Sequence, residues 1–251
     1  MRRARLFLLA VAACGGSTPS RPAPVHAEPL AGDHRHDPAH GHHQAGAHDP
    51  AHGGHHGGGM HHRFENAEAW AKVFDDPSRD AWQQPDRVIA ALALAPTMTV
   101  ADIGAGTGYF TVRIARAVPQ GTVIATDLEP DMVRYLGERA GREGLTNVRA
   151  VATPPDDPQL APASVDRVLV VDVWHHLGDR AVYARKLAAA LAPGGLVAVV
   201  DFKLDAKLGP PRQHRLAPDA IIADLAAAGL TASVALDLPE QYVVIGRRAA
   251  R

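Results

Sequence analysis

Between residues 99 and 247 the sequence alternates short apolar segments with longer segments whose apolar residues recur at helical spacing. This alternation predicts strands joined by crossover helices, which pair in parallel in a sheet covered on both faces. The last two expected strands, 231–237 and 241–247, are separated only by "LPE". Because so short a connection cannot cross over, these two strands must be antiparallel. The prediction is an α/β, doubly wound, seven-stranded sheet, mostly parallel, with one antiparallel strand near its edge.

Prolines and glycines mark where the expected elements end. Two helices are expected between residues 64 and 96, before the first strand. The other expected strands are 99–103, 122–127, 147–152, 165–172 and 196–202, and the helices between strands are 109–118, 130–141, 180–191 and 217–229. We expect all of these elements to belong to one domain, residues 63–251.

Residues 1–13 have the pattern of a lipoprotein-type signal peptide. Three arginines among the first five residues precede an apolar run that is shorter than the roughly 20 residues needed to span a membrane. The sequence "VAAC" followed by "GGS" resembles the lipobox of bacterial lipoproteins, which predicts a lipid on Cys14. The protein would then be exported and anchored to a bacterial membrane, facing the periplasm or the cell exterior. The alternatives are an ordinary signal peptide, or a start codon placed upstream of a cytosolic enzyme.

Residues 14–62 are rich in Gly, Pro, Ala and His, which predicts a disordered linker. Twelve of the fifteen histidines lie between His26 and His62. Clustered imidazoles bind metal ions, so a divalent metal is a candidate partner of this linker. A solvated spacer with incidental affinity is the alternative we favour, because a Gly-rich tether does not fix coordination geometry. We assign no metal-binding residue.

A glycine-rich stretch, "ADIGAGTGYF" at residues 101–110, follows the first expected strand. Gly104, Gly106 and Gly108 give the spacing G-x-G-x-G, whereas a dinucleotide fingerprint would place its third glycine where Tyr109 stands. Glycines at this point permit a tight turn and let a ligand approach the backbone beside a helix N-terminus. The acidic Asp102 suits a cationic cofactor better than a pyrophosphate. The stretch therefore argues against a nicotinamide-dependent oxidoreductase.

The same stretch resembles motif I of the class I S-adenosylmethionine-dependent methyltransferases. This resemblance implies a Rossmann-like fold, S-adenosylmethionine as cofactor, and cofactor contacts by the three glycines and by Asp102, which would help to position the cofactor's amino group. Asp127 ends the second expected strand 23 positions after Gly104. A carboxylate at that point can accept both ribose hydroxyls. Leu128, the next residue, is a further expected cofactor contact.

The end of the third expected strand departs from the family's pattern. The sequence is "VATPPDDPQL", with Thr153 and Pro154 where many members have Gly-Asp. Asp156 remains a candidate for contact with the adenine amino group. A helix N-cap is its alternative role.

The end of the fourth expected strand, "VVDVWHHL", resembles motif IV of small-molecule methyltransferases, and the likeness covers roughly residues 98–202. Asp172 is expected to hold the cofactor or to orient a histidine. His175 and His176 are the catalytic candidates, because a neutral imidazole near pH 7 can take a proton from a hydroxyl, thiol or amine. The alternative is that one histidine caps the next helix and the other packs inward.

Several classes of function are disfavoured. The formal net charge of −1 offers no field for gathering nucleic acid, so no nucleic-acid partner is expected. Cys-x-x-Cys clusters, a nucleophile elbow and a P-loop are lacking, as is an Asn-Pro-Pro-Tyr-type sequence after the fourth strand. We therefore predict a methyltransferase with a small-molecule methyl acceptor. The alternative is a membrane-anchored, His-rich, metal-binding lipoprotein whose methyltransferase-like domain binds a ligand without catalysis.

Overall fold

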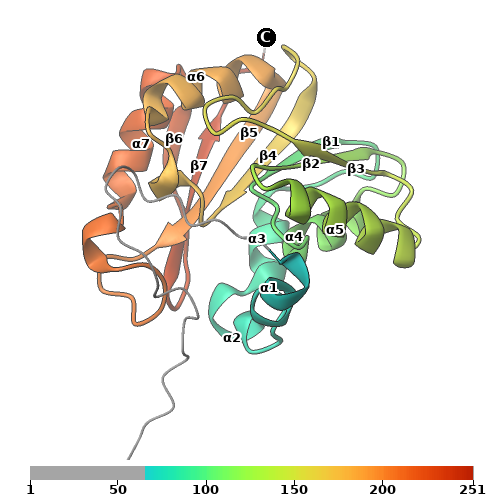
Figure 1. Cartoon of the computed structure of the whole chain (residues 1–251). Coiled ribbons are helices and arrows are strands. Elements are labelled where there is room, and N and C mark those ends of the chain that lie inside the picture. The colour runs from blue at the N-terminus through green and yellow to red at the C-terminus, as the bar shows by residue number, and fades with distance from the viewer. Residues whose placement is uncertain (1–65, 251) are drawn as a thin grey trace, which may run out of the picture. The chain divides into compact units, whose positions relative to one another are not determined.

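The computed structural model describes residues 66–250, and the predicted signal peptide, Cys14 and His-rich linker lie outside the described residues. Seven strands form one sheet in the order β3-β2-β1-β4-β5-β7-β6 (Figure 1). The strands are β1 (Thr99–Ile103), β2 (Thr122–Asp127), β3 (Val148–Ala152), β4 (Val165–Val171), β5 (Leu191–Phe202), β6 (Thr231–Asp237) and β7 (Gln241–Arg247). The α-helices are α1 (Ala67–Phe74), α2 (Arg79–Gln83), α3 (Pro85–Ala91), α4 (Tyr109–Ala117), α5 (Pro130–Arg142), α6 (Arg180–Ala190) and α7 (Pro218–Ala227). Two 3-10 turns are η1 (Trp174–His176) and η2 (Arg212–His214).

Strand β7 is the reversed strand that the sequence predicts near the sheet edge. It pairs antiparallel with both β5 and β6, whereas β1 to β5 pair in parallel. The Leu238 N–H donates to the Gln241 carbonyl at 2.9 Å, which closes the short connection between β6 and β7. The predicted sheet is confirmed.

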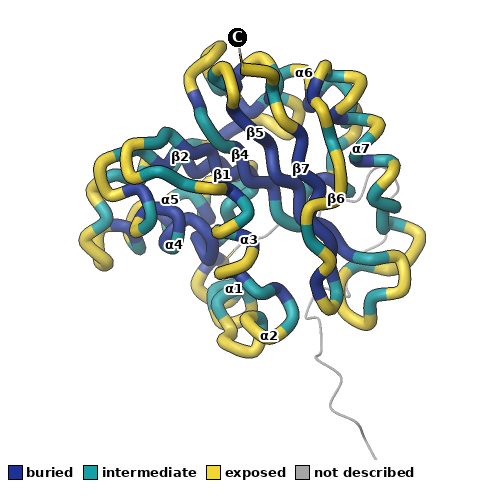
Figure 2. Tube along the Cα trace, turned by 180° about the vertical axis from the view of Figure 1, so that it is seen from behind, coloured by how far each residue is buried: buried dark blue, intermediate teal, exposed yellow. Residues whose placement is uncertain are grey.

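Side chains of the central strands alternate between two apolar layers. In β4, Val168 and Val170 pack toward α6 and α7, while Leu169 packs toward α3 and α4. This period of two is what a strand buried on both faces requires. Figure 2 shows β1, β4, β5 and β7 buried along much of their length. Because these strands are apolar along much of their length, the polar groups described below lie where the strands end.

The segment before β1 forms three helices, not the two expected from the sequence. Gln84 adopts a left-handed conformation, with φ of 48°, and Pro85 opens α3. Proline has no backbone N–H to continue the preceding helix, so the chain breaks here and starts again. None of the helices described is long and apolar enough to cross a membrane.

Strand β5 begins earlier than expected. It starts at Leu191, which pairs with Val165, and the pairing shifts register before it resumes between Arg167 and Leu196. The expected turn at "PGG" is therefore an irregular start of the strand. The other element ends agree with the prediction within one or two residues.

Candidate active site

The glycine loop between β1 and α4 has the backbone geometry that its sequence predicts. Gly104, Gly106 and Gly108 have φ angles of 67°, 55° and 94°, all in the left-handed region. Other residue types adopt this region only at a cost in free energy. The loop then enters α4 at Tyr109, so the chain turns sharply at the carboxyl end of β1.

The three glycines differ in what a side chain would meet. A Cβ at Gly104 would lie 2.3 Å from Cγ2 of Val173, and Gly108 is crowded in the same way. These two glycines are required by the protein's own packing. A Cβ at Gly106 would meet only the ring of Phe74, at 3.6 Å, which is ordinary contact. The backbone at Gly106 is thus the part of the loop that a ligand can approach.

Asp127, at the end of β2, lies against the glycine loop. Its Oδ2 accepts a hydrogen bond from the Gly106 N–H at 2.8 Å, and its Oδ1 accepts one from the Glu129 N–H at 3.0 Å. Burial raises the pKa of Asp127, although these backbone donors oppose the shift. Each carboxylate oxygen keeps acceptor capacity. Binding of the ribose by Asp127 stays a prediction, and the acid stands beside Gly106 as that role requires.

Asp102 lies beneath the loop and is 3% exposed. Its Oδ2 accepts a hydrogen bond from Thr111 Oγ1 at 2.6 Å, which ties β1 to α4. Burial raises the pKa of Asp102 to about 6, with the Thr111 hydroxyl opposing and the charge of Asp127 adding to the rise. A contact between Asp102 and the cofactor's amino group stays a prediction.

The two remaining expected cofactor contacts are exposed. Leu128 is 45% exposed beside Asp127, where its apolar side chain can lie against a flat ring. Asp156 is exposed, and its backbone carbonyl accepts a hydrogen bond from Lys186 Nζ at 2.7 Å. No helix begins between residues 153 and 164, so the N-cap alternative for Asp156 is wrong. Prolines at 154, 155, 158 and 162 interrupt helical hydrogen bonding there.

Helix α1 and the turn after it are held against the glycine loop by α5. Arg139 of α5 donates from Nη1 to the Thr107 carbonyl at 2.9 Å and to Asp75 Oδ1 at 2.8 Å. The Ala67 N–H at the start of α1 donates to Asp131 Oδ2 at 2.7 Å. The segment before β1 therefore covers the cofactor loop.

A second polar cluster lies where β4 and β5 end, at the same edge of the sheet. Asp201 is fully buried at the end of β5. Asp172 follows β4 and has a left-handed φ of 59°. Its Oδ1 accepts a hydrogen bond from Gln241 Nε2 at 2.5 Å, and its Oδ2 a longer one from Gln83 Nε2 at 3.4 Å. The carboxyl of Asp172 thus sits between amides of β7 and α2.

The Asp172 carboxyl is electrostatically unusual. Burial raises its pKa to about 7, and the nearby charge of Asp201 adds to the rise. Arg79 and His175 act in the opposite direction. Perturbed carboxyls of this kind gather at functional sites.

The two candidate catalytic histidines occupy different environments. The side chain of His175 is 3% exposed, and its Nδ1 lies 2.8 Å from Asp201 Oδ1. His176 is exposed, and its ring centroid lies 4.2 Å from that of His175. Burial lowers the pKa of His175, but the hydrogen bond and charge of Asp201 and the charge of Asp172 outweigh it, so the pKa is raised. The catalytic assignment stays a prediction for both residues.

The sequence left two alternative roles for the histidines, which are capping of the next helix and inward packing. The cap of α6 is Asp179, whose Oδ1 accepts from the Val182 N–H at 2.9 Å, so the capping alternative is wrong. Asp179 performs this role because its carboxylate reaches the backbone N–H of the third residue of the helix. Inward packing describes His175. Trp174 is fully buried in the core, and its Nε1 donates to Asp224 Oδ2 at 3.1 Å.

Arg79 of α2 brings a positive charge to the cluster. Its Nη2 and Nε donate to Gln83 Oε1 at 2.6 and 3.1 Å, and its Nη1 donates to the Phe74 carbonyl. The guanidinium carbon lies 4.5 Å from the centroid of the Tyr109 ring. Burial lowers the pKa of Arg79, and the charge of Asp172 opposes that shift. An arginine in this setting is a ready partner for an anionic group.

The loop that follows β5 is organised around Arg215. The guanidinium donates to carbonyls along the loop, at 3.2 Å or less: Lys203, Ala206, Leu208 and Pro210. Gln241, beside Asp172, starts β7 next to the beginning of this loop, since Gln241 pairs with Phe202. The loop therefore borders the Asp172 and Asp201 cluster.

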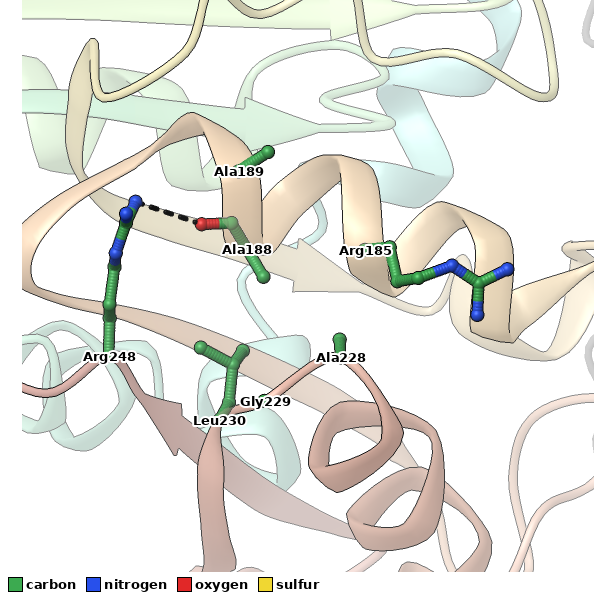
Figure 3. A pocket seen from close by; sticks show the side chains of 7 residues that line it. All are labelled: Arg185, Ala188, Ala189, Ala228, Gly229, Leu230 and Arg248. Carbon is green, nitrogen blue, oxygen red and sulfur yellow. Dashed lines mark hydrogen bonds between the residues drawn. The ribbon is translucent and has the colours of Figure 1, made fainter.

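A hollow of about 310 Å³ lies between the end of α6 and the start of β6, at the amino ends of the parallel strands and away from the glycine loop (Figure 3). Arg248 donates there to the Ala188 carbonyl at 3.2 Å, while Arg185 points away from that contact. Ligands of open α/β sheets bind at the carboxyl ends of the strands, so this hollow is not the site. Within residues 66–250 no group of three or more His, Cys, Asp or Glu side chains is arranged to hold a metal.

Asp201, Gln83, Gln241 and Arg79 were not expected from the sequence. One signal pointed to Asp201: the sequence "VVD" occurs at the carboxyl end of both β4 and β5, and Val171 pairs with Val200. Equal endings on neighbouring parallel strands bring the two acids to the same edge. No comparable pattern marks the glutamines or Arg79, because their positions depend on how α2 and β7 pack.

The loop and its surroundings fit S-adenosylmethionine. A Cβ at Gly106 would meet only Phe74, in ordinary contact, and Asp127 lies beside this glycine. Two buried hydroxyls, of Thr107 and Thr126, make no hydrogen bond within the described part of the chain, which is consistent with a polar ligand at this loop. The fold, the glycine loop and the acid together resemble those of class I S-adenosylmethionine-dependent methyltransferases.

Comparison with known proteins supports this class. Residues 101–197 match the family model described as a methyltransferase domain. The crystal structure of a SAM-dependent methyltransferase from Aquifex aeolicus aligns with a TM-score of 0.67 and 25% identity, over 71% of this chain and 97% of that one. The chain is thus similar to S-adenosylmethionine-dependent methyltransferases over these residues.

Relatives of the chain with similar sequences are named methyltransferases. A trans-aconitate 2-methyltransferase of Rhodopseudomonas palustris is 29% identical over 134 residues, which are 53% of this chain and 48% of that protein. An uncharacterised methyltransferase of Mycobacterium bovis is 35% identical over 130 residues, 51% of this chain and 50% of that protein. The chain spans about half the length of these relatives.

Proposed function

We propose that this protein transfers a methyl group from S-adenosylmethionine to a small-molecule acceptor. The observation that carries the proposal is the contact between its two polar regions. Val173, next to Asp172, packs so closely on Gly104 that a Cβ there would lie 2.3 Å from it. The cofactor loop and the histidine–carboxylate cluster are therefore neighbours at the carboxyl ends of β1, β4 and β5.

The protein's own residues would position the cofactor and the acceptor and would remove the acceptor's proton. When bound, the cofactor supplies an electrophilic methyl carbon for in-line displacement. The glycine loop, Asp127 and Leu128 would hold it, and the covering α1 would exclude water. His175 or His176 would take the proton that a hydroxyl, thiol or amine loses on methylation.

A small acceptor is supported by three features. The relative from Rhodopseudomonas palustris is named for trans-aconitate, which is a small molecule. The formal net charge of −1 gives no attraction for nucleic acid. Arg79, beside Asp172 and Tyr109, offers a cation to an acceptor that carries an anionic group.

Calorimetric titration of the full-length protein with S-adenosylmethionine tests the cofactor half of the proposal. We expect saturable binding that Asp127→Ala weakens at least about tenfold, which corresponds to losing about 1.4 kcal/mol of hydrogen bonding. Glu138→Ala, an exposed change on α5, is the matched control and should bind like the wild type. Absence of heat in the wild type, or equal affinity in Asp127→Ala, would contradict the proposal.

A product assay tests the methyl transfer itself. The full-length protein is incubated with S-adenosylmethionine and panels of small hydroxyl, thiol, amine and carboxyl compounds, and S-adenosylhomocysteine is measured. We expect release that depends on one acceptor class and is lost in Asp127→Ala. Cofactor binding without turnover on any panel would favour a domain that binds the ligand without catalysis.

We propose further that Cys14 carries a lipid and anchors the exported protein to a bacterial membrane. The support is the basic start, the apolar run and "VAAC" before "GGS". The His-rich segment would then lie between anchor and enzyme, where a divalent metal ion is a candidate ligand of its imidazoles.

A further inference from the structure

The inference concerns a carboxylate that shapes the proposed base, and it rests on the proposed methyl transfer. His175 and Asp201 form a pair that is almost closed to solvent. Their side chains are 3% and 0% exposed, and the Nδ1–Oδ1 distance is 2.8 Å. At this distance and depth the hydrogen bond has no water to compete with it.

The geometry around Asp201 decides which ring nitrogen carries the proton. Asp201 Oδ1 also accepts the Phe202 backbone N–H at 2.8 Å, so this oxygen is oriented as an acceptor. A carboxylate oxygen accepts hydrogen bonds and does not donate them. The proton of the neutral imidazole therefore lies on Nδ1. Within residues 66–250 no hydrogen bond to Nε2 is found, so the lone pair of this nitrogen is not used by the described part of the chain.

We propose that Asp201 is a positioning residue that holds His175 as the Nδ1-protonated tautomer, so that Nε2 accepts the proton of the methyl acceptor. As the acceptor's heteroatom forms its bond to the methyl carbon, the carbon–sulfur bond breaks and its electron pair stays on sulfur. The acceptor's proton passes to Nε2. Asp201 then faces an imidazolium, whose positive charge it stabilises.

Other charged groups surround this pair from several elements. Asp172 after β4 adds negative charge, and Arg79 of α2 faces Asp172 with positive charge. The His176 ring is tilted against that of His175 on η1, and burial, with the charge of Asp201, raises the pKa of the Tyr242 phenol on β7. Asp201 is the one among them that is hydrogen-bonded to the His175 ring.

Nitrogen NMR of the full-length protein, labelled with ¹⁵N-histidine and free of cofactor and acceptor, tests the proposal directly. His175→Gln identifies the resonances of the residue. We expect couplings of the Nδ1-protonated tautomer in the wild type, and loss of that preference in Asp201→Ala. Asp201→Asn keeps an acceptor oxygen but removes the charge, so the pKa of His175 should fall by about one unit or more.

An Nε2-protonated ring in the wild type, or an unchanged His175 titration in Asp201→Asn, would overturn the proposal. Asp201→Asn should still bind S-adenosylmethionine like the wild type, which shows that the variant is folded. The tautomer is measured without cofactor or acceptor, so this test does not depend on methyl transfer. If the proposed methyl transfer is wrong, the wild type will still show the Nδ1-protonated tautomer but will not turn over any acceptor.

Kinetics supply a second readout once an acceptor is identified. Asp201→Asn should lower kcat at least about tenfold and move the acidic limb of its pH profile to lower pH. Equal loss of rate at every pH, with an unmoved limb, would show a merely structural role and contradict the assignment. Glu138→Ala, the exposed change on α5, is the control and should keep the wild-type limb.

Discussion

Asp172 is a residue whose ionisation the fold resists, because it is partly buried beside the acid of Asp201. Its backbone is also unfavourable, with a φ of 59°. Asparagine is among the residues that tolerate this conformation. The side chain therefore costs stability at neutral pH, which is common where a protein maintains a polar functional site.

This cost gives Asp172→Asn a pH signature. A carboxyl whose pKa is raised in the folded state contributes stability that is present below its unfolded pKa of about 4 and lost as pH rises through the folded value. With a folded pKa of about 7, the wild type should lose stability relative to the variant over that window. The scale is about 1.4 kcal/mol for each pH unit of the shift.

Urea unfolding of both proteins across that window measures the difference. Asp102, whose pKa is also raised, is present in both and cancels. The exposed Asp205→Asn is the control and should track the wild type at every pH. A constant offset between Asp172→Asn and the wild type would show that Asp172 does not titrate in this range.

The glycines of the loop make a second prediction at the level of single residues. Gly104→Ala should lose roughly 1–2 kcal/mol from its left-handed backbone and about 1–3 kcal/mol more from overpacking on Val173. Gly106→Ala has room and should show the backbone cost alone, but it should bind S-adenosylmethionine more weakly. Urea unfolding and calorimetry separate the two effects. Equal stability loss in both variants would contradict the packing argument.

Helix α1 depends on a contact that its own sequence does not supply. Arg139 joins Asp75 to the Thr107 carbonyl with a side chain that is 17% exposed. Hydrogen bonds that involve a charged, partly buried group contribute more than surface pairs. Arg139 of α5 therefore helps to hold the cover over the glycine loop, together with the contact between Ala67 and Asp131.

Arg139→Met should lower the free energy of unfolding by about 1–3 kcal/mol, because it leaves the Thr107 carbonyl and Asp75 without their donor. Amide hydrogen exchange should rise in α1 and in the loop at residues 104–108. Arg142→Met, three positions on, removes an exposed pair at 3.8 Å and should change stability by less than about 0.5 kcal/mol. Similar exchange in both variants would show that Arg139 does not hold the cover.

The sheet elements were predictable because each carries a local signal. The strand β4 shows unbroken apolar residues, α5 opens on a proline, and the β6–β7 connection is too short to cross over. The three helices before β1 were less predictable, because the break at Gln84 depends on a residue in the left-handed conformation. The glycine loop and Asp127 could be found from spacing alone. The repeated "VVD" was the one signal for Asp201. Gln83 and Gln241 carry no such signal, since separate elements bring them to the site only in the folded chain.

At the scale of the whole molecule, the site joins the cofactor loop to the cluster of Asp172 and Asp201. The strand order places β1, which carries the cofactor loop, beside β4, and β4 beside β5. The cofactor loop and the Asp172 and Asp201 cluster thus lie on successive strands of one sheet edge. This arrangement follows from the reversal of strand order at β1 and β4, where open α/β sheets bind their ligands.

The proposed lipid anchor makes a prediction for the whole molecule. Cells grown with a clickable fatty acid should label the wild type and leave Cys14→Ser unlabelled, because Cys14 is the single cysteine of the chain. The labelled protein should sediment with membranes. An unlabelled wild type, or equal label on Cys14→Ser, would contradict the anchor.

The loop closed by Arg215 has a consequence for how acceptor choice can evolve. Its carbonyls are gathered by one guanidinium, while its ends are fixed by β5 and α7. We therefore expect residues 203–214 to accept changes in sequence while Arg215 and both ends stay in place. Such changes would alter the border of the Asp172 and Asp201 cluster and leave the glycine loop and Asp127 as they are.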